Sequence, residues 1–143
     1  MGGSINGSAA FDFSGSAISM SQDGTRVAIG ASLSDGTGKT NDGHVRVFGW
    51  DSESSSWDQV GADIDGEASR DRSGVVSISD DGSIVAIGAS SNDGNGENSG
   101  HVRIYQNNSG TWQQIGSDID GEASGDRSGC SVSLSADGSI VAI

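Results

Sequence analysis

The sequence predicts an all-β fold built from repeated four-stranded units, and three observations support this. Residues 61–74 return as residues 116–129, and the residues after each copy also repeat, with a period of about 55 residues. Short segments alternate apolar and polar residues, with the period of two that marks a strand with one buried face. Helical periodicity is absent from the sequence. A repeat of this length suits one four-stranded blade of a β-propeller.

Each predicted unit begins with two strands joined by a tight turn. The first strand covers residues 17–21, 76–79 and 132–135 in successive units. An Asp-Gly pair follows each of them, and glycine accepts the positive φ that a two-residue hairpin turn requires. The second strand covers residues 27–32, 84–90 and 140–143. Its near-continuous small and β-branched residues suit a strand that is covered on both faces.

Two further strands complete the unit after a loop rich in Gly and Asp. They cover residues 44–48 and 57–61 in the first unit and residues 101–105 and 112–116 in the second. The prediction is one repeat domain, residues 1–143, in which 1–15 are the tail of a preceding linker, 16–72 a first blade, 73–127 a second blade and 128–143 the first hairpin of a third. About two and a half blades do not close a propeller, so we expect further blades of the same chain or a homo-oligomer.

Composition and charge exclude several classes of protein. Seven basic residues against 20 acidic ones give a net charge of −13, and nucleic-acid binding needs Lys and Arg to neutralise phosphates. No apolar run reaches the roughly 18 residues that membrane insertion requires, and the start has no signal peptide. The single cysteine, Cys130, allows no intrachain disulfide. We therefore expect neither nucleic acid nor a membrane span.

The repeat contains two short motifs with a known counterpart. The pattern Ser-Gly-x-x-Val-Ser-Leu-Ser-x-Asp-Gly-Ser-x-Val-Ala-Ile-Gly-Ala-Ser, followed by a Gly/Asp loop and Gly-His-Val-Arg-Val-Phe, resembles the FG-GAP repeat of integrin-alpha-type β-propellers. Ser14-Gly15, Ser73-Gly74 and Ser128-Gly129 stand in the place of Phe-Gly, and Gly30-Ala31-Ser32 and Gly88-Ala89-Ser90 in the place of Gly-Ala-Pro. Because the departures recur between repeats, they indicate a divergent branch. The resemblance implies propeller blades with the first strand innermost, and an extracellular or cell-surface location.

The linker between units carries oxygen side chains at alternate positions, which is typical of a calcium loop. The candidate metal ligands are Asp63, Asp65, Glu67, Asp71, Asp118, Asp120, Glu122 and Asp126. The glycine stands at position 4 of this pattern, whereas the usual calcium loop has it at position 6. The cation loop of integrin-type propellers also lies elsewhere, between the first two strands of a blade. The alternative is that these carboxylates accept backbone N–H groups in Asx turns. Calcium is the cofactor that the pattern predicts, and both interpretations stay open here.

Histidines and serines complete the set of candidate residues. His44 and His101 recur at the start of the third strand with no second ligand at metal spacing, which favours a packing or hydrogen-bonding role. Residues 92–98 offer alternate oxygens, but their counterpart contains Lys39 and Thr40, which favours a flexible turn. The sequence has no nucleophile-elbow motif, so we predict no enzymatic activity.

These observations predict a non-enzymatic interaction module that presents its loops to a protein or a glycan, stiffened by calcium if the linker binds it. A structural, self-assembling subunit of a larger complex is the second hypothesis. The third is an enzyme with a site in the propeller channel, which would need a unique polar cluster instead of repeated residues.

Overall fold

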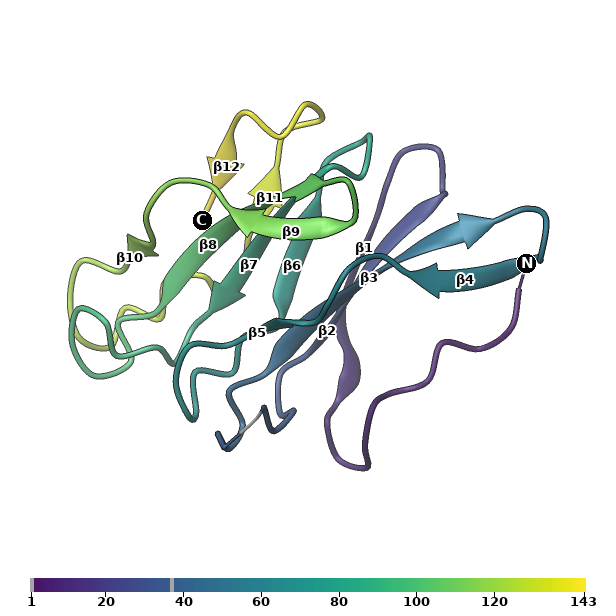
Figure 1. Cartoon of the computed structure of the whole chain (residues 1–143). Helices are drawn as coiled ribbons and strands as arrows, with labels where there is room; N and C mark the ends of the chain where they lie inside the picture. The colour runs from purple at the N-terminus through teal and green to yellow at the C-terminus, as the bar shows by residue number, and fades with distance from the viewer. Residues whose placement is uncertain (1, 37) are drawn as a thin grey trace.

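The computed structural model describes residues 2–36 and 38–143, and this part of the chain is all-β. Two five-stranded antiparallel sheets stand side by side, and a two-stranded hairpin lies beyond the second sheet (Figure 1). The described residues include no helix, and hence none that could span a membrane. The prediction of an all-β fold with antiparallel sheets is confirmed.

The first sheet contains the first repeat. Its strands are β1 (Ser14–Met20), β2 (Arg26–Ala31), β3 (His44–Asp51) and β4 (Ser56–Gln59), in that order, with β5 (Ile64–Asp65) also paired to β3. Ile18 of β1 lies opposite Ile29 of β2. Strands β1 and β2 meet at the predicted Asp-Gly turn, so the alternation of apolar residues and the turn specify the same hairpin.

The second sheet repeats this arrangement. Its strands are β6 (Val75–Ile78), β7 (Ile84–Ala89), β8 (His101–Asn108), β9 (Thr111–Gln114) and β10 (Ile119–Asp120), and the following hairpin pairs β11 (Ser133–Leu134) with β12 (Val141–Ala142). Val76 lies opposite Ile87, as Ile18 lies opposite Ile29 in the first sheet. The sequence repeat is therefore also a repeat of strand register.

The structure departs from the predicted strands at the outer side of each sheet. Strands β5 and β10 lie in residues that the sequence assigns to the linker, because two-residue strands are too short to show a period of two. The third strand extends to Asp51 in the first sheet, where Trp50 pairs with Trp57 across the β3–β4 hairpin. The two indole rings meet edge to face with centroids 5.4 Å apart, a favourable aromatic geometry.

The main hydrophobic core lies between the two sheets. It consists of Ala28, Val45, Val47, Ile64, Val76, Ile78, Val85, Ile87 and Tyr105. Val76 and Ile78 come from β6, which packs against β1 and β2 of the first sheet. Burial of these β-branched side chains stabilises the stacked arrangement, at roughly 1.5–3 kcal/mol for each fully buried side chain.

The backbones of successive repeats approach each other closely at one point of each junction. Gly30 of β2 lies against the carbonyl oxygen of Gly74, and Gly88 of β7 lies in the same way against that of Gly129. A Cβ atom at either strand glycine would overlap that oxygen. The glycines of the Gly-Ala-Ser and Ser-Gly motifs therefore meet across each junction, and the contact explains why the Gly-Ala-Ser motif needs glycine.

Each Asp-Gly turn is held by one carboxylate. In the second repeat Asp81 accepts hydrogen bonds from the Ser79 hydroxyl at 2.6 Å and from the Ser83 amide at 2.9 Å, and the Ser79 hydroxyl accepts one from the Ile84 amide at 3.0 Å. Asp23 and Asp137 make the same contacts in the other repeats. These bonds stabilise the ionised form, so the pKa of each carboxyl is lowered, to about 2 for Asp137.

We therefore expect the protein to lose stability in acid through these turns. A carboxyl with a lowered folded-state pKa contributes stability above its unfolded pKa, and this contribution is lost as the pH falls through the folded pKa. For Asp137 the window runs from the ordinary pKa of 3.8 down to about 2. Urea unfolding between about pH 5 and about pH 2 should show a shallower pH dependence for the D23N/D81N/D137N variant than for the parent.

Glu53→Gln is the matched control, since it also removes a carboxyl but no hydrogen bond to the Glu53 carboxylate occurs in the described part of the chain. Its pH dependence should follow that of the parent protein. An equally steep loss of stability in the triple variant would contradict the assignment.

Candidate functional site

The two histidines lie beside the linker carboxylates. His44 and His101 begin β3 and β8, and their side chains are almost fully buried. The short strands β5 and β10 pair with β3 and β8, which places Asp65 opposite His44 and Asp120 opposite His101. Two groups of possible metal ligands result, and they are His44 with Asp63 and Asp65, and His101 with Glu67 and Asp118.

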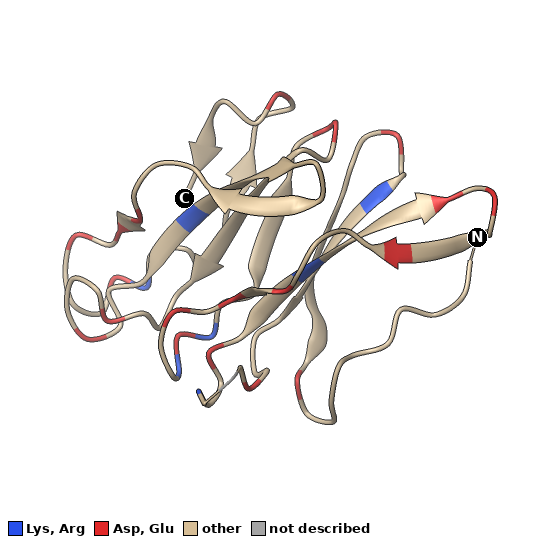
Figure 2. Cartoon of the chain, in the orientation of Figure 1, with Lys and Arg blue, Asp and Glu red and all other residues tan. Residues whose placement is uncertain are grey.

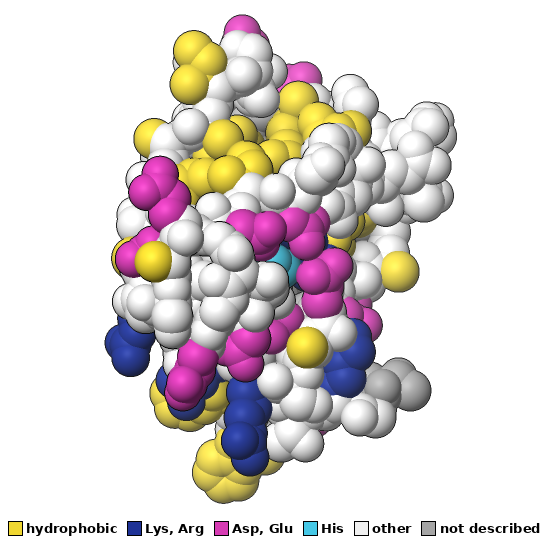
Figure 3. Space-filling model, turned by 90° about the vertical axis from the view of Figure 1, so that its left-hand side faces the viewer, with side chains coloured by type: hydrophobic (Ala, Val, Ile, Leu, Met, Phe, Trp, Pro, Cys, Tyr) yellow, Lys and Arg dark blue, Asp and Glu magenta, His cyan; other side chains and the backbone are white. Residues whose placement is uncertain are grey.

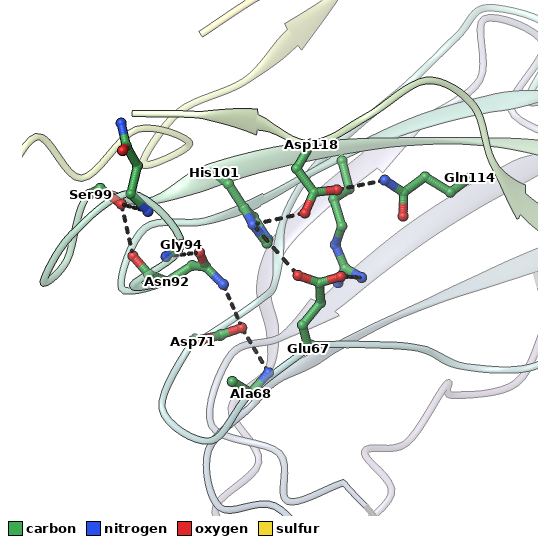
Figure 4. A network of polar contacts seen from close by, with 12 residues as sticks. Glu67, Ala68, Asp71, Asn92, Gly94, Ser99, His101, Gln114 and Asp118 are labelled. Atoms are coloured by element: carbon green, nitrogen blue, oxygen red, sulfur yellow. Dashed lines mark hydrogen bonds and ion pairs between the residues drawn. The ribbon is translucent and has the colours of Figure 1, made fainter. Parts of the chain in front are cut away.

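The His101 group has its carboxylate oxygens directed at one ring nitrogen. The Nδ1 atom of His101 lies 3.7 Å from Asp118 Oδ2 and 3.9 Å from Glu67 Oε2 (Figure 4). The Nε2 group of Gln114 donates a hydrogen bond of 2.6 Å to the other Asp118 oxygen, and Arg103 Nη1 lies 3.6 Å from the other Glu67 oxygen. Each carboxylate is thus held through one oxygen and directs the second toward His101.

Burial favours the neutral form of His101. Desolvation lowers the pKa of His101 below its ordinary value of 6.5, the positive charge of Arg103 lowers it further, and Asp118 and Glu67 raise it to a smaller extent. A neutral imidazole has one nitrogen with a free lone pair and one N–H group. The Nε2 atom is buried and has no hydrogen-bond partner among residues 2–36 and 38–143.

The His44 group is built differently. The Nδ1 atom of His44 lies 3.9 Å from Asp63 Oδ2, and Gln59 donates a hydrogen bond of 2.7 Å to the other Asp63 oxygen. Its third member, Asp65, belongs to the same linker as Asp63, whereas a serine, Ser8, occupies the sequence position that corresponds to Glu67. The His101 group therefore differs in combining carboxylates from two successive linkers.

The remaining linker carboxylates lie outside both groups. Asp71 accepts hydrogen bonds from the Ala68 amide at 2.9 Å and from Asn92 Nδ2 at 3.0 Å, and Asp126 accepts one from the Ala123 amide at 2.7 Å. The two bonds from backbone amides are of the kind that the alternative interpretation predicts, whereas Asn92 donates from its side chain. Asp120 and Glu122 belong to neither group. The eight predicted ligands are thus distributed over separate places, and calcium binding by the linker stays a prediction.

The sequence predicts a packing or hydrogen-bonding role for the histidines, and the His101 side chain makes no hydrogen bond among the described residues. Its neighbours Glu67 and Asp118 come from two different linkers, so no local spacing in the sequence identifies them. One signal was present, since a histidine begins the third strand and an aspartate begins the linker in both repeats.

A polar cleft forms a second candidate site at the loop end of the sheets. This is the end at which the long loops follow β2 and β7. It has a volume of about 480 Å³ and is lined by Asn41, Arg70, Arg72, Ser90, Ser91, Asp93, Glu97, Asn98 and Arg127. Three of the seven basic residues line this cleft in a strongly acidic chain, whose acidic residues lie mostly in loops and turns (Figure 2). Arg70, Arg72 and Arg127 have positive φ angles of 75°, 54° and 54°, which are uncommon for residues other than glycine.

The backbone around this cleft is fixed by hydrogen bonds. The Arg72 amide donates to the Asn41 carbonyl at 3.1 Å, and the Arg127 amide makes the same bond to Asn98 at 3.1 Å. Residues held in rare backbone conformations by their surroundings often cluster at binding sites.

Neither a protein-family model nor a curated protein matches this sequence.

Proposed function

We propose that the protein is a non-enzymatic interaction module of the FG-GAP-like β-propeller type, and that its cleft binds a carboxylate group of a protein or glycan partner. The observation that carries the proposal is the gathering of Arg70, Arg72 and Arg127 at the loop end of the sheets. Planar guanidinium groups bind carboxylates through paired, charge-assisted hydrogen bonds.

The repeated junction supports the propeller interpretation. The Ser19 hydroxyl accepts a hydrogen bond from the Ile78 amide at 3.1 Å, and the Ser77 hydroxyl accepts one from the Leu134 amide at 3.0 Å. Together with the Gly30–Gly74 contact, these bonds join each unit to the next in the same way. In a β-propeller, each four-stranded sheet packs on the next in the same arrangement.

The charge pattern of the cleft supports a small, specific anionic partner. Asp93 and Glu97 line the same cleft as the arginines, and the chain as a whole is strongly negative. Long-range attraction for an extended polyanion is therefore weak. A single carboxylate that reaches the guanidinium groups gains their hydrogen bonds, and the fixed loops reduce the entropy lost on binding.

The test is binding to two defined probes, an acidic peptide containing Glu and an oligosaccharide containing uronic acid. Calorimetric titration should detect saturable binding of one of them, and the identity of that probe distinguishes a protein partner from a glycan. The R72A/R127A variant should bind at least tenfold more weakly, because each hydrogen bond between charged groups contributes about 1.5–3 kcal/mol.

Arg26→Ala is the control for the loss of positive charge. Arg26 pairs with Gly49 at the end of β2 that is opposite the cleft loops, so its removal should leave binding unchanged. Equal affinity of the parent and the R72A/R127A variant, or no binding of either probe, would overturn the proposal.

The alternative, a self-assembling structural subunit, is favoured by one observation. Ile18 and Met20 of β1 are 62% and 54% exposed, whereas Val76 and Ile78, at the corresponding positions of β6, are each only 7% exposed. A second copy packed on β1 would bury these side chains as the first sheet buries those of β6. Sedimentation would then show a mass above that of the monomer, and the I18D/M20D variant would return it to the monomer mass.

A further inference from the structure

The His101 imidazole is a buried polar group without a hydrogen bond. Its side chain is 1% exposed, and its Nδ1 atom lies 3.7 and 3.9 Å from the carboxylates, beyond the usual range of about 2.7–3.2 Å for a hydrogen bond. Buried polar groups are almost always satisfied, and neither ring nitrogen of His101 has a hydrogen-bond partner among the described residues. An ion between Nδ1 and the two carboxylates would give Nδ1 a partner, whereas the buried Nε2 would remain unpaired.

The carboxylates are arranged to receive such an ion. Gln114 holds Asp118 and Arg103 holds Glu67, each through the oxygen that faces away from His101. Contacts of this kind orient metal ligands, and their loss typically lowers metal affinity about 10–100-fold. The donor atoms of His101, Glu67 and Asp118 all lie within 4.8 Å of one another.

The donor set identifies the class of ion. One imidazole nitrogen and two carboxylate oxygens suit zinc and related divalent transition metals, whereas calcium prefers six to eight oxygen ligands. Tetrahedral zinc holds nitrogen and oxygen ligands about 3.3 Å apart. The observed separations of 3.7 and 3.9 Å are longer than this value, so a bound ion would draw both carboxylates closer to Nδ1.

The group also has access to solvent. The side chains of Glu67 and Asp118 are 45% and 29% exposed, while His101 lies beneath them. The space-filling view shows a small area of histidine side chain between Asp and Glu side chains (Figure 3). An ion can therefore enter past the carboxylates and reach the buried ring.

We propose that His101, Glu67 and Asp118 form a binding site for zinc or a similar divalent transition metal at the junction between the two repeats. Glu67 lies between β5 of the first sheet and β6 of the second, and Asp118 lies between β9 and β10 of the second sheet. The bound ion joins both linkers to β8 and leaves its fourth position to water. This site is separate from the arginine cleft and does not depend on the partner proposed for it.

The test is a titration of the metal-free protein with Zn²⁺ in competition with a coloured chelator. The parent protein should bind Zn²⁺ at this site, and its melting temperature should rise with the metal concentration. Loss of one carboxylate in E67Q or D118N should weaken binding at least about tenfold, as changes around metal sites do. Co²⁺ in place of Zn²⁺ should give the visible absorption of a tetrahedral centre in the parent protein and not in H101A.

The His44 group supplies the matched control. H44A removes an equivalent buried histidine from the preceding repeat, and the Co²⁺ spectrum of the His101 site should persist in it. Glu67 is a partly exposed side chain, so E67Q tests the site even if H101A does not fold. Parent-like Zn²⁺ affinity in E67Q, or loss of the Co²⁺ spectrum in H44A but not in H101A, would overturn the proposal.

Discussion

Replacing Gly30 by alanine is expected to lower the free energy of unfolding by about 3 kcal/mol, because the added methyl group overpacks the junction between the two sheets. The new Cβ would overlap the carbonyl oxygen of Gly74, a backbone atom that cannot move aside as a side chain can. Relief of the overlap requires the second sheet to move away from the first. This movement would open the core around Val76 and Ile78.

Gly49→Ala is the control within the same sheet. A Cβ at Gly49 of β3 would lie 3.3 Å from Arg26 Nη1 and 3.3 Å from Val60 Cγ2, both of which are side-chain atoms that can adjust. Urea unfolding monitored by tryptophan fluorescence should therefore show a large decrease for G30A and a small change for G49A. Equal stabilities of the two variants would show that the glycine contact does not hold the sheets together.

The hairpins were predictable from the sequence because several local signals agree. Around Asp81 and Gly82, strict alternation, a turn dipeptide and β-branched residues all specify the same two strands. The observed β7 ends at Ala89, one residue before the predicted end. The turn contacts of Asp81 are also local, since its partners Ser79 and Ser83 lie two residues away on either side.

The His101 group could not be predicted, because its geometry depends on non-local pairing. Glu67 and Asp118 reach His101 only after β10 has paired with β8 and the second sheet has packed on the first.

The turn at residues 92–98 is another example of a feature that depends on non-local contacts. Sequence reasoning interprets it as flexible, whereas Asn92 is buried and donates a hydrogen bond to Asp71 of the preceding linker.

A second large effect is expected from Val76→Asp, which should lower the free energy of unfolding by about 3–5 kcal/mol because it buries a carboxylate without a partner. Val76 belongs to the core between the sheets, and the neighbouring core side chains are apolar. Since small domains are stable by only about 5–15 kcal/mol, this loss should leave a substantial unfolded population at moderate urea concentrations.

Ile18→Asp is the matched variant, since Ile18 holds the same position in β1 that Val76 holds in β6. Ile18 is 62% exposed, so an aspartate there stays hydrated and should change stability by less than about 0.5 kcal/mol. Both variants place the same charge at the same strand position, but only Val76 is covered by a neighbouring sheet. A difference between their free energies of unfolding therefore measures the effect of that packing. A large loss of stability in I18D that grows with protein concentration would instead show that another copy covers β1, as the self-assembly alternative requires.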